Sequence, residues 1–132
     1  MVLIILGAIV FLCTYSNVLE FNIEAKARTF KDVEILKIVD KIAECESGDY
    51  NLAINPDDGG SRSIGVLQFK DETFKLYANK YNILPEGIEE KEIENLMWFE
   101  DVQKDLAYEM INENKENIRH WLNCGKLLKL IK

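Results

Sequence analysis

One amphipathic segment, KDVEILKIVDKIAECE at residues 31–46, constrains the fold most, because it ends abruptly in a polar loop. Its apolar residues recur at the spacing of a helix with one buried face, and they are Ile35, Ile38, Val39, Ile42 and Ala43. Gly48 is a natural stop for this helix. Residues 48–65 are rich in Gly, Asn, Asp, Ser and Pro, which predicts a long loop that can contain a short β-hairpin at DDGG.

The remainder of the chain also has a helical pattern. Residues 71–82 predict a second helix with an apolar side formed by Phe74, Leu76, Tyr77 and Tyr81. Residues 95–114 predict a longer helix with an apolar stripe formed by Phe99, Val102, Leu106 and Met110. Residues 115–124 predict a last helix that ends at Gly125. No repeat or long linker divides the chain, so we expect one small, mainly α domain with its functional site on the polar loop.

The N-terminus carries an uncharged apolar run at residues 2–13. A membrane-spanning helix needs about 20 apolar residues. The run is shorter, but if the more polar residues 14–17 are allowed, it extends to Leu19 and could just span a membrane. The run also fits the apolar part of a secretory signal, with Ala25 and Ala27 spaced as in a cleavage site. We therefore predict that residues 1–27 are a signal peptide or a membrane anchor over residues 2–19. Residues 28–132 would then form the domain of a protein exported to the cell envelope or secreted.

The charge of the chain and its low histidine content argue against a nucleic-acid partner and against a metal site. The chain of 132 residues has a formal net charge of −7 and no basic stripe, which argues against a nucleic-acid partner. Its single histidine, His120, lies in a helical pattern and is expected to be a packing or surface residue. No Cys/His spacing suggests a metal site, and we expect neither a metal nor another cofactor.

Two cysteines, Cys45 and Cys124, remain once Cys13 is assigned to the apolar N-terminal run. An even number of cysteines in an oxidising compartment is consistent with a disulfide. Such a bond would close a loop of about 80 residues, and chain entropy would make it worth up to roughly 4 kcal/mol. Two buried thiols are the alternative.

The two glutamates at the end of the first helix are not equivalent. Glu46 follows Ile35 by eleven residues and Ile42 by four, so it continues the buried stripe, whereas Glu44 falls mainly on the solvent face. The negative end of the helix dipole and partial burial should both raise the pKa of Glu46. A carboxylic acid that stays protonated near neutral pH suits a general acid in glycosidic cleavage. A carboxylate that caps loop amides is the structural alternative.

The residues after Glu46 resemble a known family. ESGDYNLAINP followed by SIGVLQFKDET resembles the signature of the lytic transglycosylase (SLT) family of lysozyme-like domains. Glu46-Ser47-Gly48 matches the family's Glu-Ser-Gly, and Ala53, Asn55 and Pro56 match its loop. The run SIGVLQ, residues 63–68, resembles the Ala-x-Gly-Leu-Met-Gln run, and residues 72–73 match the Glu-Thr that follows it.

The chain also departs from the family pattern. The insertion DDGGSR at residues 57–62 makes the loop longer, and Asp71 replaces the usual proline before Glu-Thr. The downstream Tyr-Asn-x-Gly motif has no clear counterpart. The segment IRHWLNCGK instead resembles small wall-cleaving domains in which a late cysteine pairs with one beside the catalytic glutamate, which implies a Cys45–Cys124 disulfide.

The resemblance implies an α+β lysozyme-like fold and cleavage of the β-1,4 bond between N-acetylmuramic acid and N-acetylglucosamine in peptidoglycan. Glu46 would be the general acid and base, and a monomer acting on glycan strands is expected. The candidate substrate-binding residues are Tyr50, Ser63, Gly65 and Gln68. A hydrolytic lysozyme would need a second carboxylate, for which Asp57 and Asp58 are the candidates, although both also suit a turn before Gly-Gly. A non-catalytic wall-binding domain of the same fold is the remaining alternative.

Overall fold

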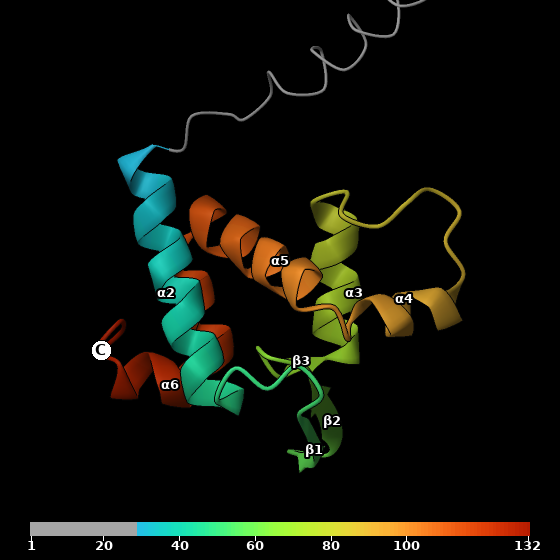
Figure 1. Cartoon of the computed structure of the whole chain (residues 1–132), viewed down its shortest axis with the longest axis horizontal. Coiled ribbons are helices and arrows are strands. Elements are labelled where there is room, and N and C mark those ends of the chain that lie inside the picture. The colour runs from blue at the N-terminus through green and yellow to red at the C-terminus, as the bar shows by residue number, and fades with distance from the viewer. Residues whose placement is uncertain (1–28) are drawn as a thin grey trace, which may run out of the picture.

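A computed structural model describes residues 29–132, so the predicted signal or anchor over residues 1–27 lies outside the described residues. Within residues 29–132, no helix is long and apolar enough to cross a membrane. This part of the chain is mainly helical and carries one small antiparallel sheet, which confirms the mainly α class with added β structure (Figure 1).

The first described helix, α2, spans Phe30–Ser47. It begins with a capping box in which Thr29 and Asp32 each accept a hydrogen bond from the other's backbone N–H, at 3.2 and 2.7 Å. It ends at Gly48, whose left-handed backbone (φ 66°) closes the last turn. The buried residues of α2 are Ile35, Val39, Ile42 and Ala43, so the predicted stripe and stop are confirmed.

Three short strands follow α2 and form one antiparallel sheet in the order β1-β2-β3. Strands β1 (Ile54–Asp58) and β2 (Ser61–Ile64) make the predicted hairpin, with an irregular register between Asn55 and Asp58. The sequence did not indicate the third strand, β3 (Phe69–Lys70), which pairs Phe69 with Ile64. Only two residues form β3, too few to leave a periodic pattern.

The predicted helix over residues 71–82 is α3, which spans Asp71–Lys80. Phe74 and Ala78 are its buried residues, and Tyr77 and Tyr81 pack at the edge of the core. Leu76 was wrongly placed on the apolar side, because it is 65% exposed.

The long helix expected over residues 95–114 is two helices, α4 (Glu90–Leu96) and α5 (Glu100–Glu113). Phe99 lies between them in extended backbone and is 59% exposed, so its place on the predicted stripe is wrong. In a continuous helix the carbonyl of Met97 would accept from the amide four residues later. Here it accepts from the side chain of Gln103, which holds the break in place.

The C-terminal segment forms a 3₁₀ helix, η1 (Lys115–Trp121), followed by α6 (Leu122–Leu127). The prediction that Gly125 ends the last helix is wrong, because α6 continues through it. A Cβ on Gly125 would lie 2.9 Å from Cδ1 of Ile131, so this glycine permits close packing of the chain end rather than a stop.

The core lies where α2, α5, α3 and the sheet meet (Figure 1). Helices α2 and α5 pack against each other, α3 packs on α5, and α6 lies beside the lower end of α2. The fully buried side chains in this core include Val39, Ile42, Ile64, Leu67, Phe74, Leu106 and Met110. The arrangement brings the C-terminal end of α2 close to the sheet and to α6.

A disulfide joins Cys45 in the last turn of α2 to Cys124 in α6, with 5.8 Å between their Cα atoms. The bond closes a loop across 79 positions of sequence, and this confirms the predicted pair. It attaches the residue before Glu46 to the C-terminal helix, so it restrains the helix end at which the candidate site begins.

Candidate active site

Glu46 lies in the last turn of α2, between the disulfide-bonded Cys45 and Ser47. Its side chain is half-buried, whereas Glu44 is exposed, so the predicted difference between the two glutamates is confirmed. A half-buried carboxyl group is shielded from bulk water on one side and can still reach a ligand on the other. This position is compatible with acid–base chemistry.

Ser47 connects the end of α2 to the GVLQ segment, residues 65–68. Its hydroxyl donates a hydrogen bond to the carbonyl of Val66 at 2.8 Å, and the two residues are 19 positions apart in sequence. The same hydroxyl also lies 3.2 Å from the carbonyl of Ala43, one helical turn earlier. Ser47 is therefore a structural link between the Glu46 turn and the GVLQ segment.

Gln68 has a left-handed backbone (φ 50°), which is uncommon for a residue other than glycine. Its side-chain nitrogen donates to the carbonyl of Gly65 at 2.8 Å and to that of Ala53 at 3.2 Å. Because a primary amide has two N–H hydrogens, these two bonds use both of them. A ligand would therefore meet the carbonyl oxygen of Gln68 as a hydrogen-bond acceptor.

Gly65 is buried and also has a left-handed backbone (φ 79°). A Cβ at this position would lie 1.9 Å from Nε2 of Gln103, so the space that a side chain would need is already filled. Gly65 thus lies in close contact with the side chain of Gln103 in α5. Its burial argues against direct contact with a sugar.

Trp121 holds the GVLQ segment from the C-terminal side. Its indole Nε1–H donates to the carbonyl of Leu67 at 2.8 Å, and its ring meets Phe69 edge to face at a centroid distance of 5.4 Å. Trp121 is only 4% exposed, so this bond is sheltered from water.

Replacing Trp121 with Phe should lower the free energy of unfolding by about 1–2 kcal/mol, because a buried carbonyl loses its donor. Thermal unfolding followed by circular dichroism would show this as a fall in Tm of roughly 5–15 °C for a domain of this size. Trp98→Phe, at a half-buried position, is the matched control for lost aromatic area. An equal fall in Tm for both variants would contradict the importance of the Leu67 bond.

Two other predicted ligand contacts, Tyr50 and Ser63, occupy contrasting places. Ser63 is 1% exposed in β2, paired with Asn55 and Lys70 in the sheet, and this burial argues against direct contact with substrate. Tyr50 is 57% exposed in the turn that follows α2, so its ring is available to a ligand. Of these two residues, only Tyr50 is open to a sugar.

The candidate second carboxylates lie at the end of the β1–β2 hairpin. The carboxylate of Asp57 accepts a hydrogen bond from the amide of Gly60 at 3.4 Å, as expected for an aspartate that shapes a turn. Asp58 is the last residue of β1 and pairs with Ser61 across the turn. This hairpin geometry agrees with the turn-forming interpretation of both residues.

Two charged residues that differ from the transglycosylase-like motif pattern, Arg62 and Asp71, meet in space. Arg62 donates to Asp71 at 3.0 Å and to Glu94 of α4 at 2.7 Å. Hydrogen bonds from the guanidinium to Glu94 and then Asp71 raise the pKa of Arg62. These ion pairs connect β2 to the start of α3 and to α4. The side chains are partly exposed, so we expect a modest contribution to stability.

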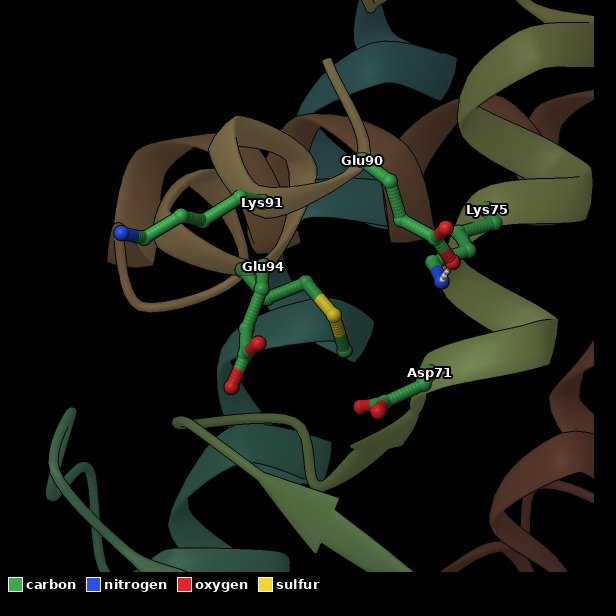
Figure 2. A pocket seen from close by; sticks show the side chains of 6 residues that line it. Asp71, Lys75, Glu90, Lys91 and Glu94 are labelled. Atoms are coloured by element: carbon green, nitrogen blue, oxygen red, sulfur yellow. Dashed lines mark hydrogen bonds and ion pairs between the residues drawn. The ribbon is translucent and has the colours of Figure 1, made fainter.

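A charged pocket of about 490 Å³ lies between α3 and α4 (Figure 2). Figure 2 shows Asp71 and Lys75 on the α3 side, Lys91 and Glu94 on the α4 side, and Lys75 paired with Glu90. None of the predicted catalytic or substrate-binding residues lines this pocket. It is therefore separate from the assembly around Glu46.

Lys104 places a positive charge between α2 and α5. Its ammonium lies 2.8 Å from Glu100, 3.0 Å from Asp40 and 4.0 Å from Asp49, the residue after the helix stop. Partial burial alone would lower the pKa of Lys104, but the hydrogen bonds to Glu100 and Asp40 outweigh it and raise the pKa. Lys104 is thus a charged link between the helix that carries Glu46 and α5.

His120 donates to or accepts from the hydroxyl of Tyr77 at 3.0 Å, which fits the packing or surface role expected for it. Within the described part of the chain, no three His, Cys, Asp or Glu side chains are grouped so that they could hold a metal ion.

Sequence reasoning missed Gln103, a buried residue of α5 whose side chain binds the backbone on both sides of Gly65 and Val66. It is 0% exposed and bonds to the backbone of both Ile64 and Leu67. A signal was present, because Gln103 precedes Leu106 by three residues and Met110 by seven, and so falls on the buried stripe of α5. An uncharged polar residue on such a stripe indicates a specific buried hydrogen-bond network.

No family model, curated protein or solved structure matches the chain in comparisons with known proteins.

Proposed function

We propose that the protein is a peptidoglycan-cleaving glycosidase of the lytic transglycosylase type, with Glu46 as general acid and base. The observation that carries this proposal is the 2.8 Å hydrogen bond from Ser47 to Val66. It joins the Glu-Ser-Gly and GVLQ parts of the motif pattern, which lie far apart in sequence.

The reaction would proceed in two steps at one carboxyl group. Protonated Glu46 gives its proton to the glycosidic oxygen, the bond from that oxygen to the anomeric carbon breaks, and an oxocarbenium-like muramyl sugar develops. The resulting Glu46 carboxylate then takes the proton of the same sugar's 6-hydroxyl. The 6-oxygen bonds to the anomeric carbon, which closes a 1,6-anhydro ring and returns Glu46 to its protonated form.

The geometry of Asp57 argues against this residue as the second carboxylate of a hydrolytic lysozyme. Its carboxylate already accepts from the amide of Gly60, as part of the hairpin turn. A hydrolytic enzyme would need a second carboxylate free to activate water or to attack the sugar. We therefore expect Asp57→Asn to leave the rate of wall cleavage unchanged, measured by the release of soluble muropeptides.

Two residues of the loop region, Gln68 and Tyr50, are suited to bind the glycan. The carbonyl oxygen of Gln68 can accept from an amide N–H or hydroxyl of an N-acetylated sugar, because the amide hydrogens of Gln68 are bonded within the protein. The exposed ring of Tyr50 offers an apolar face on which a sugar can stack. With a net charge of −7, the protein has no general electrostatic attraction to anionic wall polymers. These local contacts would have to supply the affinity.

The experiment that tests the function is mass spectrometry of muropeptides released from purified sacculi by the full chain. Products that end in 1,6-anhydro-N-acetylmuramic acid are expected, each lacking one water relative to a reducing end. Reducing ends alone would assign the protein as a hydrolytic lysozyme. Binding to sacculi with no released product would indicate the non-catalytic wall-binding alternative. Export of the protein, by residues 2–19 acting as signal or anchor, would give it access to this substrate.

A further inference from the structure

Gln103 is an amide side chain buried completely in the middle of α5. Its Oε1 accepts from the backbone N–H of Leu67 at 2.8 Å, and its Nε2 donates to the carbonyl of Ile64 at 3.0 Å and to that of Met97. Both of its hydrogens and one of its acceptor positions are therefore used. All three partners are backbone groups, and two of them flank Gly65 and Val66.

The side chain of Gln103 fills the space that a side chain at Gly65 would need. The distance of 1.9 Å between Nε2 of Gln103 and a Cβ placed on Gly65 excludes every side chain at position 65 while Gln103 holds its present place. The left-handed backbone of Gly65 adds a second reason for glycine. The turn and the amide thus fix each other's position.

Three elements hold the backbone of the GVLQ segment, each through one side chain. Ser47 of α2 binds the carbonyl of Val66, Gln103 of α5 binds the amide of Leu67, and Trp121 of η1 binds the carbonyl of Leu67. Only Gln103 also binds the other end of the turn, at Ile64. The segment that carries Gln68 is therefore held against the Glu46 helix directly by Ser47, and α5 holds both ends of its turn.

We propose that Gln103 is a positioning residue for the candidate active site, and that its buried amide sets the place of Gln68 and of the Ser47 contact relative to Glu46. This inference rests on the proposed function. An apolar side chain would fill the same space but would leave the amide of Leu67 and the carbonyl of Ile64 without partners, so the turn would have to move. A displacement of about 1 Å between catalytic and binding groups can lower turnover by about 100-fold.

Gln103→Met tests this, because methionine has nearly the same length and volume but cannot replace the amide's hydrogen bonds. At equal amounts of folded protein, we expect the kcat for muropeptide release by the full chain to fall by about 10- to 100-fold. Amide exchange at Leu67, measured by NMR, should become at least about tenfold faster. Gln103→Asn, which keeps an amide but draws it back by one methylene, should give intermediate values for both. If Gln103→Met does not fold, kcat and Leu67 exchange in Gln103→Asn still test the inference.

Met110→Leu is the matched control, because it changes another fully buried side chain of α5 while conserving volume. It should leave both kcat and Leu67 exchange at wild-type values, which separates positioning of the turn from general weakening of the core. Wild-type kcat and wild-type Leu67 exchange in Gln103→Met would overturn the inference. If the wild-type protein releases no muropeptides, the proposed function fails, and Leu67 exchange still decides whether Gln103 positions the turn.

Discussion

Glu46→Gln is expected to reduce muropeptide release by roughly 10²- to 10⁴-fold, the usual contribution of a general acid–base group. Glutamine keeps the size of the side chain and its ability to accept a hydrogen bond, but it cannot transfer a proton at neutral pH. The loss corresponds to about 3–5 kcal/mol of transition-state stabilisation. Initial rates of muropeptide release from sacculi, with folding checked by circular dichroism, would measure it.

Glu44→Gln is the matched control for this experiment. Glu44 is two residues away on the same helix, but it is exposed, so its replacement should leave the rate near the wild-type value. Wild-type activity in Glu46→Gln would refute the assignment of Glu46 as the acid. A fall in Tm without any change in rate would instead support the capping alternative, in which the Glu46 carboxylate only satisfies loop amides.

Removal of the disulfide should have the largest effect on stability. The double variant Cys45→Ser/Cys124→Ser opens a loop that spans 79 positions, and the free energy of unfolding should fall by roughly 3–4 kcal/mol. For a domain of about 100 residues, this corresponds to a fall in Tm of roughly 12–25 °C. Activity should fall as well, because the bond restrains the α2 turn that contains Glu46. Thermal unfolding with and without reductant would measure the fall in Tm.

Cys13→Ser is the control that keeps the Cys45–Cys124 bond intact, and its Tm should equal that of the wild-type protein. Reductant should lower the Tm of the Cys13 variant and leave the Tm of the double variant unchanged. Two reactive thiols in unfolded, unreduced Cys13→Ser protein would contradict the disulfide.

Local pattern predicted the helices well where burial follows periodicity. The stripe of α2 and its end at Gly48 are as expected, because a long amphipathic segment has only one face to bury. The break between α4 and α5 was not predictable in this way. Residues 95–114 have a continuous helical pattern, yet Gln103 takes the carbonyl of Met97 as a partner, and α5 begins only at Glu100. A side-chain hydrogen bond replaces the backbone bond that a continuous helix would make at Met97, and hydrophobic periodicity does not reveal such a bond.

The candidate site likewise has features that local pattern predicted and features that it did not. Periodicity separated Glu46 from Glu44, and the motif resemblance pointed to the GVLQ segment. Neither indicated that Gly65 is held against Gln103, that Gln68 uses both amide hydrogens internally, or that Ser63 is buried. The stripe of α5 marks Gln103 as a buried polar residue, but which backbone groups it binds depends on contacts between separate elements, and spacing along one helix does not reveal them.

A mainly helical domain, a half-buried Glu46 and a pair of cysteines able to form the disulfide could all be predicted from the amino-acid sequence, because helix periodicity and residue chemistry act locally. The side chains that support the site are set by contacts between elements that are far apart in the sequence. Packing of α5 against the GVLQ segment required a buried amide at Gln103 and a glycine at Gly65. Buried backbone groups must be satisfied by whichever side chain the fold brings within reach, so that choice is made by the fold as a whole.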